Sequence, residues 1–200
     1  MSFSLFEKVN LKELRELNLS YNKISNINIL EKVNFKELKE LYLNGNEISD
    51  INILEKVNFK ELKELDIEHN EISDINILEK VNFKKLKTFY LCSNNITNIT
   101  PLLEAKFEKL EKLHLENNKI SDINLLEKVE LKELKELSFF QNYIQDIKVL
   151  KKVKFEKLEK LNLSWNKISD INILEKLNFK ELKELNLGGN NNFLLLENFD

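Results

Sequence analysis

Residues that mark disulfides, linkers and turns are scarce in this chain. Its 200 residues include one cysteine, one proline and three glycines. A single cysteine, Cys92, excludes an internal disulfide framework. So little Pro and Gly argues against flexible linkers and low-complexity segments. No apolar run approaches the roughly 18 residues that a membrane-spanning helix needs, so we expect no membrane span.

The charge balance argues against nucleic acid as a partner. The formal net charge is −3, with a sequence pI of about 5.7, whereas nucleic-acid-binding domains present strong basic patches. The first eight residues also lack a basic start followed by an apolar run, which a secretory signal would show. We therefore expect a cytoplasmic protein, most simply a monomer.

What the chain has in abundance is repetition. Asparagine returns every 24 residues through eight copies without a change of interval. A fixed period of this size is typical of a solenoid, in which one structural unit stacks on copies of itself. The asparagines are Asn22, Asn46, Asn70, Asn94, Asn118, Asn142, Asn166 and Asn190.

The second copy predicts the structure of one unit. Alternation around Leu41 and Leu43 indicates a short strand with one buried face, which must pair with its neighbours in a parallel sheet. Apolar residues at 51, 54 and 57 suit one helical turn, with Asp50 as its N-cap. Asn46 lies between these elements, where its amide can satisfy backbone groups that the turn leaves unpaired.

A stripe of aromatic residues also follows the 24-residue period. A ligand groove is one interpretation, but the stripe always accompanies other core positions, so we expect it to be core. It consists of Phe35, Phe59, Phe83, Phe107, Phe155 and Phe179, with Leu11 and Leu131 in the same slot.

The full pattern, Leu-x-x-Leu-x-Leu-x-x-Asn-x-Ile-x-x-Ile-x-x-Leu, resembles the leucine-rich-repeat family. Copies with Ile-Ser-Asp-Ile after the asparagine are similar to the short repeats of a phosphatase-1 regulatory subunit and of internalins. The resemblance implies an α/β solenoid, a horseshoe with a parallel sheet on the concave face and short helical turns on the convex face. It also implies protein binding through the concave sheet.

We expect a single domain over residues 1–200. Residues 1–13 would be an N-terminal half-repeat, residues 14–181 the repeats, and residues 182–200 a partial repeat with a cap, in which Phe193–Leu196 would cover the core.

Variable positions on the expected strands should line the concave face in three rows. They hold both histidines, the only cysteine, the only tryptophan and three of the four tyrosines. Exposed aromatic residues often anchor protein interfaces, although neutral drift would also place them there. The candidate partner-binding residues are Tyr42, Asp66, Glu68, His69, Tyr90, His114, Glu116, Phe140 and Trp165.

Charge is unevenly distributed over these rows. Glu64, Asp66 and Glu68 make the early copies acidic, which would steer a partner carrying a basic element. At the sheet edge, one column alternates Lys112, Glu136, Lys160 and Glu184, and another alternates Glu111, Lys135, Glu159 and Lys183. Neighbouring strands would then face opposite charges, each pair contributing a few tenths of a kcal/mol.

Catalytic, cofactor and metal sites are not indicated. Cys92 and His114 occupy diagonal positions about 7–8 Å apart, too far for a nucleophile and its base. Glu68, Cys92, His114 and Glu116 match no recognised metal-ligand spacing, and no phosphate-binding glycine loop is present.

We therefore expect a non-enzymatic scaffold that binds another protein. Two alternatives remain open at this point: a cell-surface adhesive protein of the internalin kind, and a structural spacer with no dedicated partner.

Overall fold

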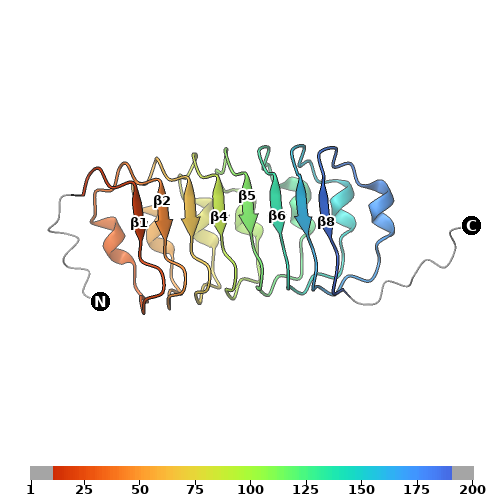
Figure 1. Ribbon diagram of the computed structural model, residues 1–200, viewed down its shortest axis with the longest axis horizontal. Coiled ribbons are helices and arrows are strands. Elements are labelled where there is room, and N and C mark those ends of the chain that lie inside the picture. Colours follow the sequence, from red (N-terminus) through yellow and green to blue (C-terminus); the bar gives the residue numbers. More distant parts are fainter. Residues whose placement is uncertain (1–10, 191–200) are drawn as a thin grey trace, which may run out of the picture.

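The computed structural model describes residues 11–190, which form one eight-stranded parallel sheet in sequence order. The strands lie side by side along the length of the molecule, with the helical turns behind them (Figure 1). Below, the concave face means the sheet face opposite those turns. The strands are β1 (Glu16–Asn18), β2 (Glu40–Tyr42), β3 (Glu64–Asp66), β4 (Thr88–Tyr90), β5 (Lys112–His114), β6 (Glu136–Ser138), β7 (Lys160–Asn162) and β8 (Glu184–Asn186).

The register of the sheet equals the sequence period. Leu17 lies opposite Leu41, which lies opposite Leu65, so each buried leucine packs on its equivalent in the next copy. The pairing also continues past the strands, since the N–H of Leu19 donates to the carbonyl of Tyr42 at 2.8 Å. The expected parallel solenoid is confirmed, with each strand centred one residue earlier than predicted.

The opposite layer consists of seven short 3₁₀ helices in the described part of the chain. Asp50 was expected to be the N-cap, but Ile51 occupies that position. Asp50 lies one residue before this N-cap, and its Oδ1 accepts a hydrogen bond from the N–H of Asn52 at 2.8 Å. The helices are η2 (Asn28–Glu31), η3 (Asn52–Glu55), η4 (Asn76–Glu79), η5 (Thr100–Leu103), η6 (Asn124–Lys128), η7 (Lys148–Lys151) and η8 (Asn172–Lys176).

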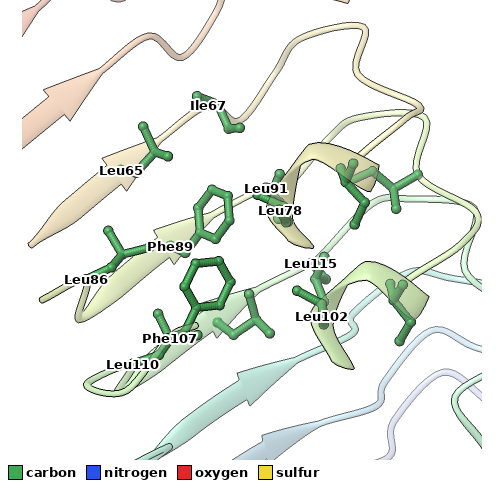
Figure 2. Packing of buried hydrophobic residues seen from close by; sticks show 14 of the residues in the cluster. Leu65, Ile67, Leu78, Leu86, Phe89, Leu91, Leu102, Phe107, Leu110 and Leu115 are labelled. Atoms are coloured by element: carbon green, nitrogen blue, oxygen red, sulfur yellow. The ribbon is translucent and has the colours of Figure 1, made fainter. Parts of the chain in front are cut away.

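The aromatic stripe is core, as expected. Phe59, Phe83 and Phe155 are buried, and Leu131 fills the same slot in its copy. Phe107 meets Phe89 of β4 edge to face, with ring centroids 5.9 Å apart (Figure 2). Phe179, near the C-terminal end of the sheet, is only partly buried.

The asparagine ladder joins each copy to the preceding one. Asn118 Nδ2 donates to the carbonyl of Leu115 in its own copy and to that of Leu91 in the copy before, at 3.1 and 3.0 Å. Its Oδ1 accepts the N–H of Ile96 at 3.0 Å. The predicted structural role is confirmed, and both Asn70 and Asn118 are buried. Asn22, in the first copy, is exposed.

The expected end structures lie partly outside the described residues. This applies to most of the half-repeat at 1–13 and to the cap at Phe193–Leu196. Between residues 11 and 190, no helix is long and apolar enough to cross a membrane.

Candidate functional site

The strands bring most of the candidate residues together on the concave face. Tyr42, Asp66, Tyr90 and His114 occupy the last position of four consecutive strands and lie opposite one another in register. Glu68, Glu116 and Phe140 follow two residues after this row, on the same face. All seven side chains are half-buried, so their neighbours hold them in place while part of each remains accessible.

The aromatic candidates are more enclosed than expected. Tyr90 stacks on His114 with ring centroids 5.0 Å apart and planes 27° from parallel. Phe140 was expected among the exposed aromatic residues of these rows, but it is half-buried. The stacked ring of Tyr90 is therefore held in position by its neighbour.

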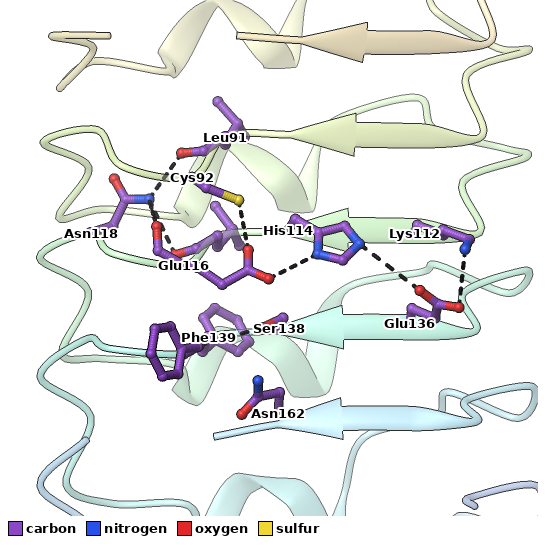
Figure 3. A network of polar contacts seen from close by, with 12 residues as sticks. Leu91, Cys92, Lys112, His114, Glu116, Asn118, Glu136, Ser138, Phe139 and Asn162 are labelled. Atoms are coloured by element: carbon purple, nitrogen blue, oxygen red, sulfur yellow. Dashed lines mark hydrogen bonds and ion pairs between the residues drawn. The ribbon is translucent and has the colours of Figure 1, made fainter. Parts of the chain in front are cut away.

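A polar network crosses the middle of this face (Figure 3). Cys92 Sγ donates to Glu116 Oε2 at 2.7 Å, and Glu116 Oε1 lies 2.9 Å from His114 Nδ1. His114 Nε2 lies 4.0 Å from Glu136, which pairs with Lys112 at 3.1 Å. The carboxylate of Glu116 thus lies between the thiol and the imidazole.

This order of groups does not activate the Cys92 thiol as a nucleophile. Burial and the adjacent Glu116 carboxylate raise the pKa of the Cys92 thiol, which therefore stays protonated at neutral pH. Burial opposes ionisation of Glu116, but hydrogen bonds from His114 and Cys92 outweigh it, and the pKa of Glu116 is lowered. Within residues 11–190, no group of three His, Cys, Asp or Glu side chains is arranged to hold a metal ion.

The early copies concentrate negative charge. Glu16, Glu40 and Glu64 face one another directly across β1, β2 and β3, an arrangement of like charges that destabilises a sheet. Burial, together with the charges of Glu68 and Glu64, raises the pKa of Asp66 to about 6, against the opposing hydrogen bond from the N–H of Glu68. This surface therefore favours a cationic ligand group.

Asp66→Asn should stabilise the protein at neutral pH and have little effect near pH 4. The folded state holds the Asp66 proton more tightly than the unfolded chain, whose pKa is about 3.9. The free energy of unfolding of the unmodified protein therefore falls as pH rises from about 4 to about 6. Because the Asp66 side chain is partly exposed, screening by solvent limits the gain to roughly 1 kcal/mol above pH 7.

Urea titrations of both proteins at several pH values would measure this difference. Asn is compatible with the site, because Asn162 Oδ1 accepts the N–H of Ser164 in the same way that Asp66 Oδ1 accepts that of Glu68. A stability difference independent of pH would contradict the explanation.

The alternating charges at the sheet edge form ion pairs, as predicted. Lys112 pairs with Glu136 and Lys160 with Glu184, both at 3.1 Å. In the other column, Lys135 Nζ lies 2.7 Å from Glu111 and Lys183 Nζ lies 2.7 Å from Glu159. These exposed pairs each contribute little to stability.

The third of the three rows was also expected on the concave face but departs from it. This row consists of Tyr21, Gly45, His69, Ser93, Asn117, Gln141, Trp165 and Gly189. Its residues follow the strands in a bend, and all eight have positive φ, between +49° and +70°. His69 and Trp165 therefore lie at the edge of the sheet, away from the other candidates. Two further aromatic residues are exposed near this edge, Tyr21 at 78% and Tyr143 at 47%. Glycine at positions 45 and 189 of this row was the sequence signal for the left-handed backbone.

A small hollow lies beside the network on the concave face. Its volume is about 200 Å³. His114, Glu116 and Glu136 line one side, and Ser138 and Asn162 are among the smaller residues that line it farther along the sheet. It is large enough for a side chain of a partner but lacks the size of a typical ligand pocket.

Sequence models of one repeat family match most of the chain. A model described as leucine-rich repeats in two copies matches residues 12–56 and 60–104. Two further leucine-rich-repeat models match residues 84–144 and 156–171. No curated protein matches the chain.

Solved structures with the same architecture include two internalins from Listeria monocytogenes. The chain is 29% identical to internalin inlF, with a TM-score of 0.75, and the match covers 90% of this chain but 49% of the internalin. For internalin C2 the identity is 28% and the TM-score 0.73, covering 92% of this chain and 76% of the other. The chain thus spans about half the length of the first relative.

A third similar structure is TLR13 in its complex with ssRNA13. Its identity is 26% and its TM-score 0.71, and the match covers 92% of this chain and 28% of TLR13.

Proposed function

The chain belongs to the leucine-rich-repeat family, and on that premise we propose that it is a non-enzymatic scaffold that binds another protein through its concave sheet. The observation that carries the proposal is the grouping of half-buried aromatic and charged side chains in copies two to six. The same rows hold small polar residues in the copies on either side, such as Asn18, Asn162 and Ser164. Aromatic residues held by their neighbours are suited to anchor an interface.

Charge indicates the chemistry of the partner. Glu40 and Glu64 lie opposite each other and close to Asp66, so their negative charges repel. Lysine or arginine side chains on the partner would reduce this repulsion. Burial, the hydrogen bond to Glu40 and the negative charges of Glu64 and Glu40 all raise the pKa of Tyr42. Complementary charge mainly accelerates association and sets specificity.

The double variant Tyr90→Ala with Phe140→Ala should lose affinity for the partner. Each truncation of an interface anchor is expected to weaken binding by about 1 kcal/mol or more, while thermal stability changes little. The partner would be identified by cross-linking and affinity capture, and affinities measured with purified proteins. Higher salt should also slow association.

A matched control is Tyr21→Ala, which removes an aromatic residue from the edge of the sheet instead of the concave face. Unchanged affinity in the double variant, or an equal loss in the control, would place the interface elsewhere.

The similarity to two internalins supports a second candidate, an adhesive repeat protein at a cell surface. The cytoplasm is the first candidate location that we propose for this protein. Protease treatment of intact cells would separate the two locations, because only a surface protein is digested.

A further inference from the structure

The bends after β5, β6 and β7 enclose a groove outside the concave rows. It lies along the edge of the sheet toward which the strand arrows point (Figure 1), and its volume is about 520 Å³. That volume is within the range of small-molecule sites. An inner row of Asn117, Gln141 and Trp165 and an outer row of Lys119, Tyr143 and Lys167 line it.

Trp165 lines this groove and lies against the backbone of the next copy. A Cβ on Gly189 would lie 2.9 Å from three different atoms of the indole ring, so the glycine backbone of the next copy covers one ring face. Trp165 is nevertheless 62% exposed. It also has a φ of +54°, which is unusual for a bulky residue. An exposed ring with one covered face and one free face is suited to stacking against a ligand ring.

Two side-chain amides extend the row from this ring. Asn117 and Gln141 each offer donors and an acceptor, and neighbouring strands are about 4.8 Å apart. That interval is comparable to the length of one pyranose unit. The two amides and the indole ring of the inner row are therefore spaced like successive sugars in an extended chain.

The groove also favours an anion. The chain contains 34 Asp and Glu residues, yet none is among the described residues that line this groove. The lining instead includes Lys119 and Lys167, and the Nζ of Lys167 lies 4.7 Å from the ring centroid of Tyr143. The cation thus lies over an aromatic ring of the outer row.

We propose that this groove binds an acidic oligosaccharide. A sugar ring stacks on Trp165, its hydroxyls pair with the amides of Asn117 and Gln141, and a sugar carboxylate lies beside Lys119 or Lys167. A single-stranded nucleic acid would also offer rings and negative charge. Such strands, however, bind by stacking successive bases on several aromatic side chains, whereas the inner row of this groove offers one aromatic ring, Trp165, beside two amides.

The chain provides its own probe, because Trp165 is the only tryptophan. Titration of the whole chain with tetragalacturonate should change the tryptophan emission saturably and release or absorb heat in calorimetry. Trp165→Ala should weaken the calorimetric affinity by about tenfold, as expected for an aromatic anchor. Lys119→Gln should weaken binding of tetragalacturonate but not of neutral cellotetraose.

Tyr21→Ala is the matched control. Tyr21 occupies the same position in the first copy, has a similar φ of +54° and lies against Gly45, yet it is outside the groove. Affinity should stay within about twofold in this variant, as for a residue away from the site. Circular dichroism would confirm that all variants fold.

Three results would overturn the proposal: no saturable response to tetragalacturonate, an equal loss in Tyr21→Ala, or tighter binding of oligouridylate or tetraglutamate than of tetragalacturonate. None of them bears on protein binding by the concave face, which is tested separately at Tyr90 and Phe140.

Discussion

Phe107→Ala should lower the free energy of unfolding by about 3–5 kcal/mol, the usual range for truncating a buried phenylalanine. Phe107 is 3% exposed, and its ring packs against that of Phe89, which is fully buried. Each repeat contacts only its neighbours, so a cavity in the middle of the solenoid weakens the contact between copies. Urea denaturation followed by circular dichroism would measure the loss.

Phe107→Leu is the control that the chain itself suggests. Leu131 occupies the equivalent slot and is 3% exposed, so leucine is compatible with the surrounding packing. This conservative change should cost roughly 1 kcal/mol. If alanine and leucine destabilised equally, the effect would come from the lost ring contact rather than from cavity volume.

The second large effect is expected at the asparagine ladder. Asn118→Leu should weaken the fold by about 1–3 kcal/mol, because buried backbone groups lose their partners. The affected groups belong to two copies: the carbonyls of Leu91 and Leu115 and the N–H of Ile96. The same urea titration would detect this loss.

Asn76→Leu is the matched comparison, with an effect within about 0.5 kcal/mol. Asn76 is exposed on the convex face, where its backbone N–H donates to Asp74 Oδ1. Similar losses at positions 76 and 118 would show that the ladder contributes nothing specific.

Features that depend on one short unit and its repetition could be predicted from the sequence. The alternation at Leu41 and Leu43 predicted a strand, and the constant period predicted the parallel register, because stacked copies must place equivalent residues side by side. The role of Asn118 followed from its place at the end of a strand. The ion pairs of Lys112 and Lys160 followed from the alternation of charge along the register.

The sequence predicted which face of the sheet carries the candidate residues, but not how their side chains are arranged on it. Strand alternation places Tyr90, His114 and Phe140 on one side of the sheet, but it does not give their exposure. Phe140 is half-buried in the folded structure, and the carboxylate of Glu116 lies between the thiol of Cys92 and the imidazole of His114. Neither follows from residue spacing.

The sequence by itself therefore determined the repeat, the core, the asparagine ladder and the edge charges, since each follows from local pattern and constant register. Only the tertiary structure decided the edge groove. Trp165 and Gly189 are 24 residues apart, and their contact depends on a left-handed backbone at both positions. Glycine at two of these positions hints at the left-handed backbone, but tyrosine, histidine and tryptophan share the same dihedral angle and do not indicate it by residue type. The exposed ring therefore becomes evident only when adjacent copies are stacked.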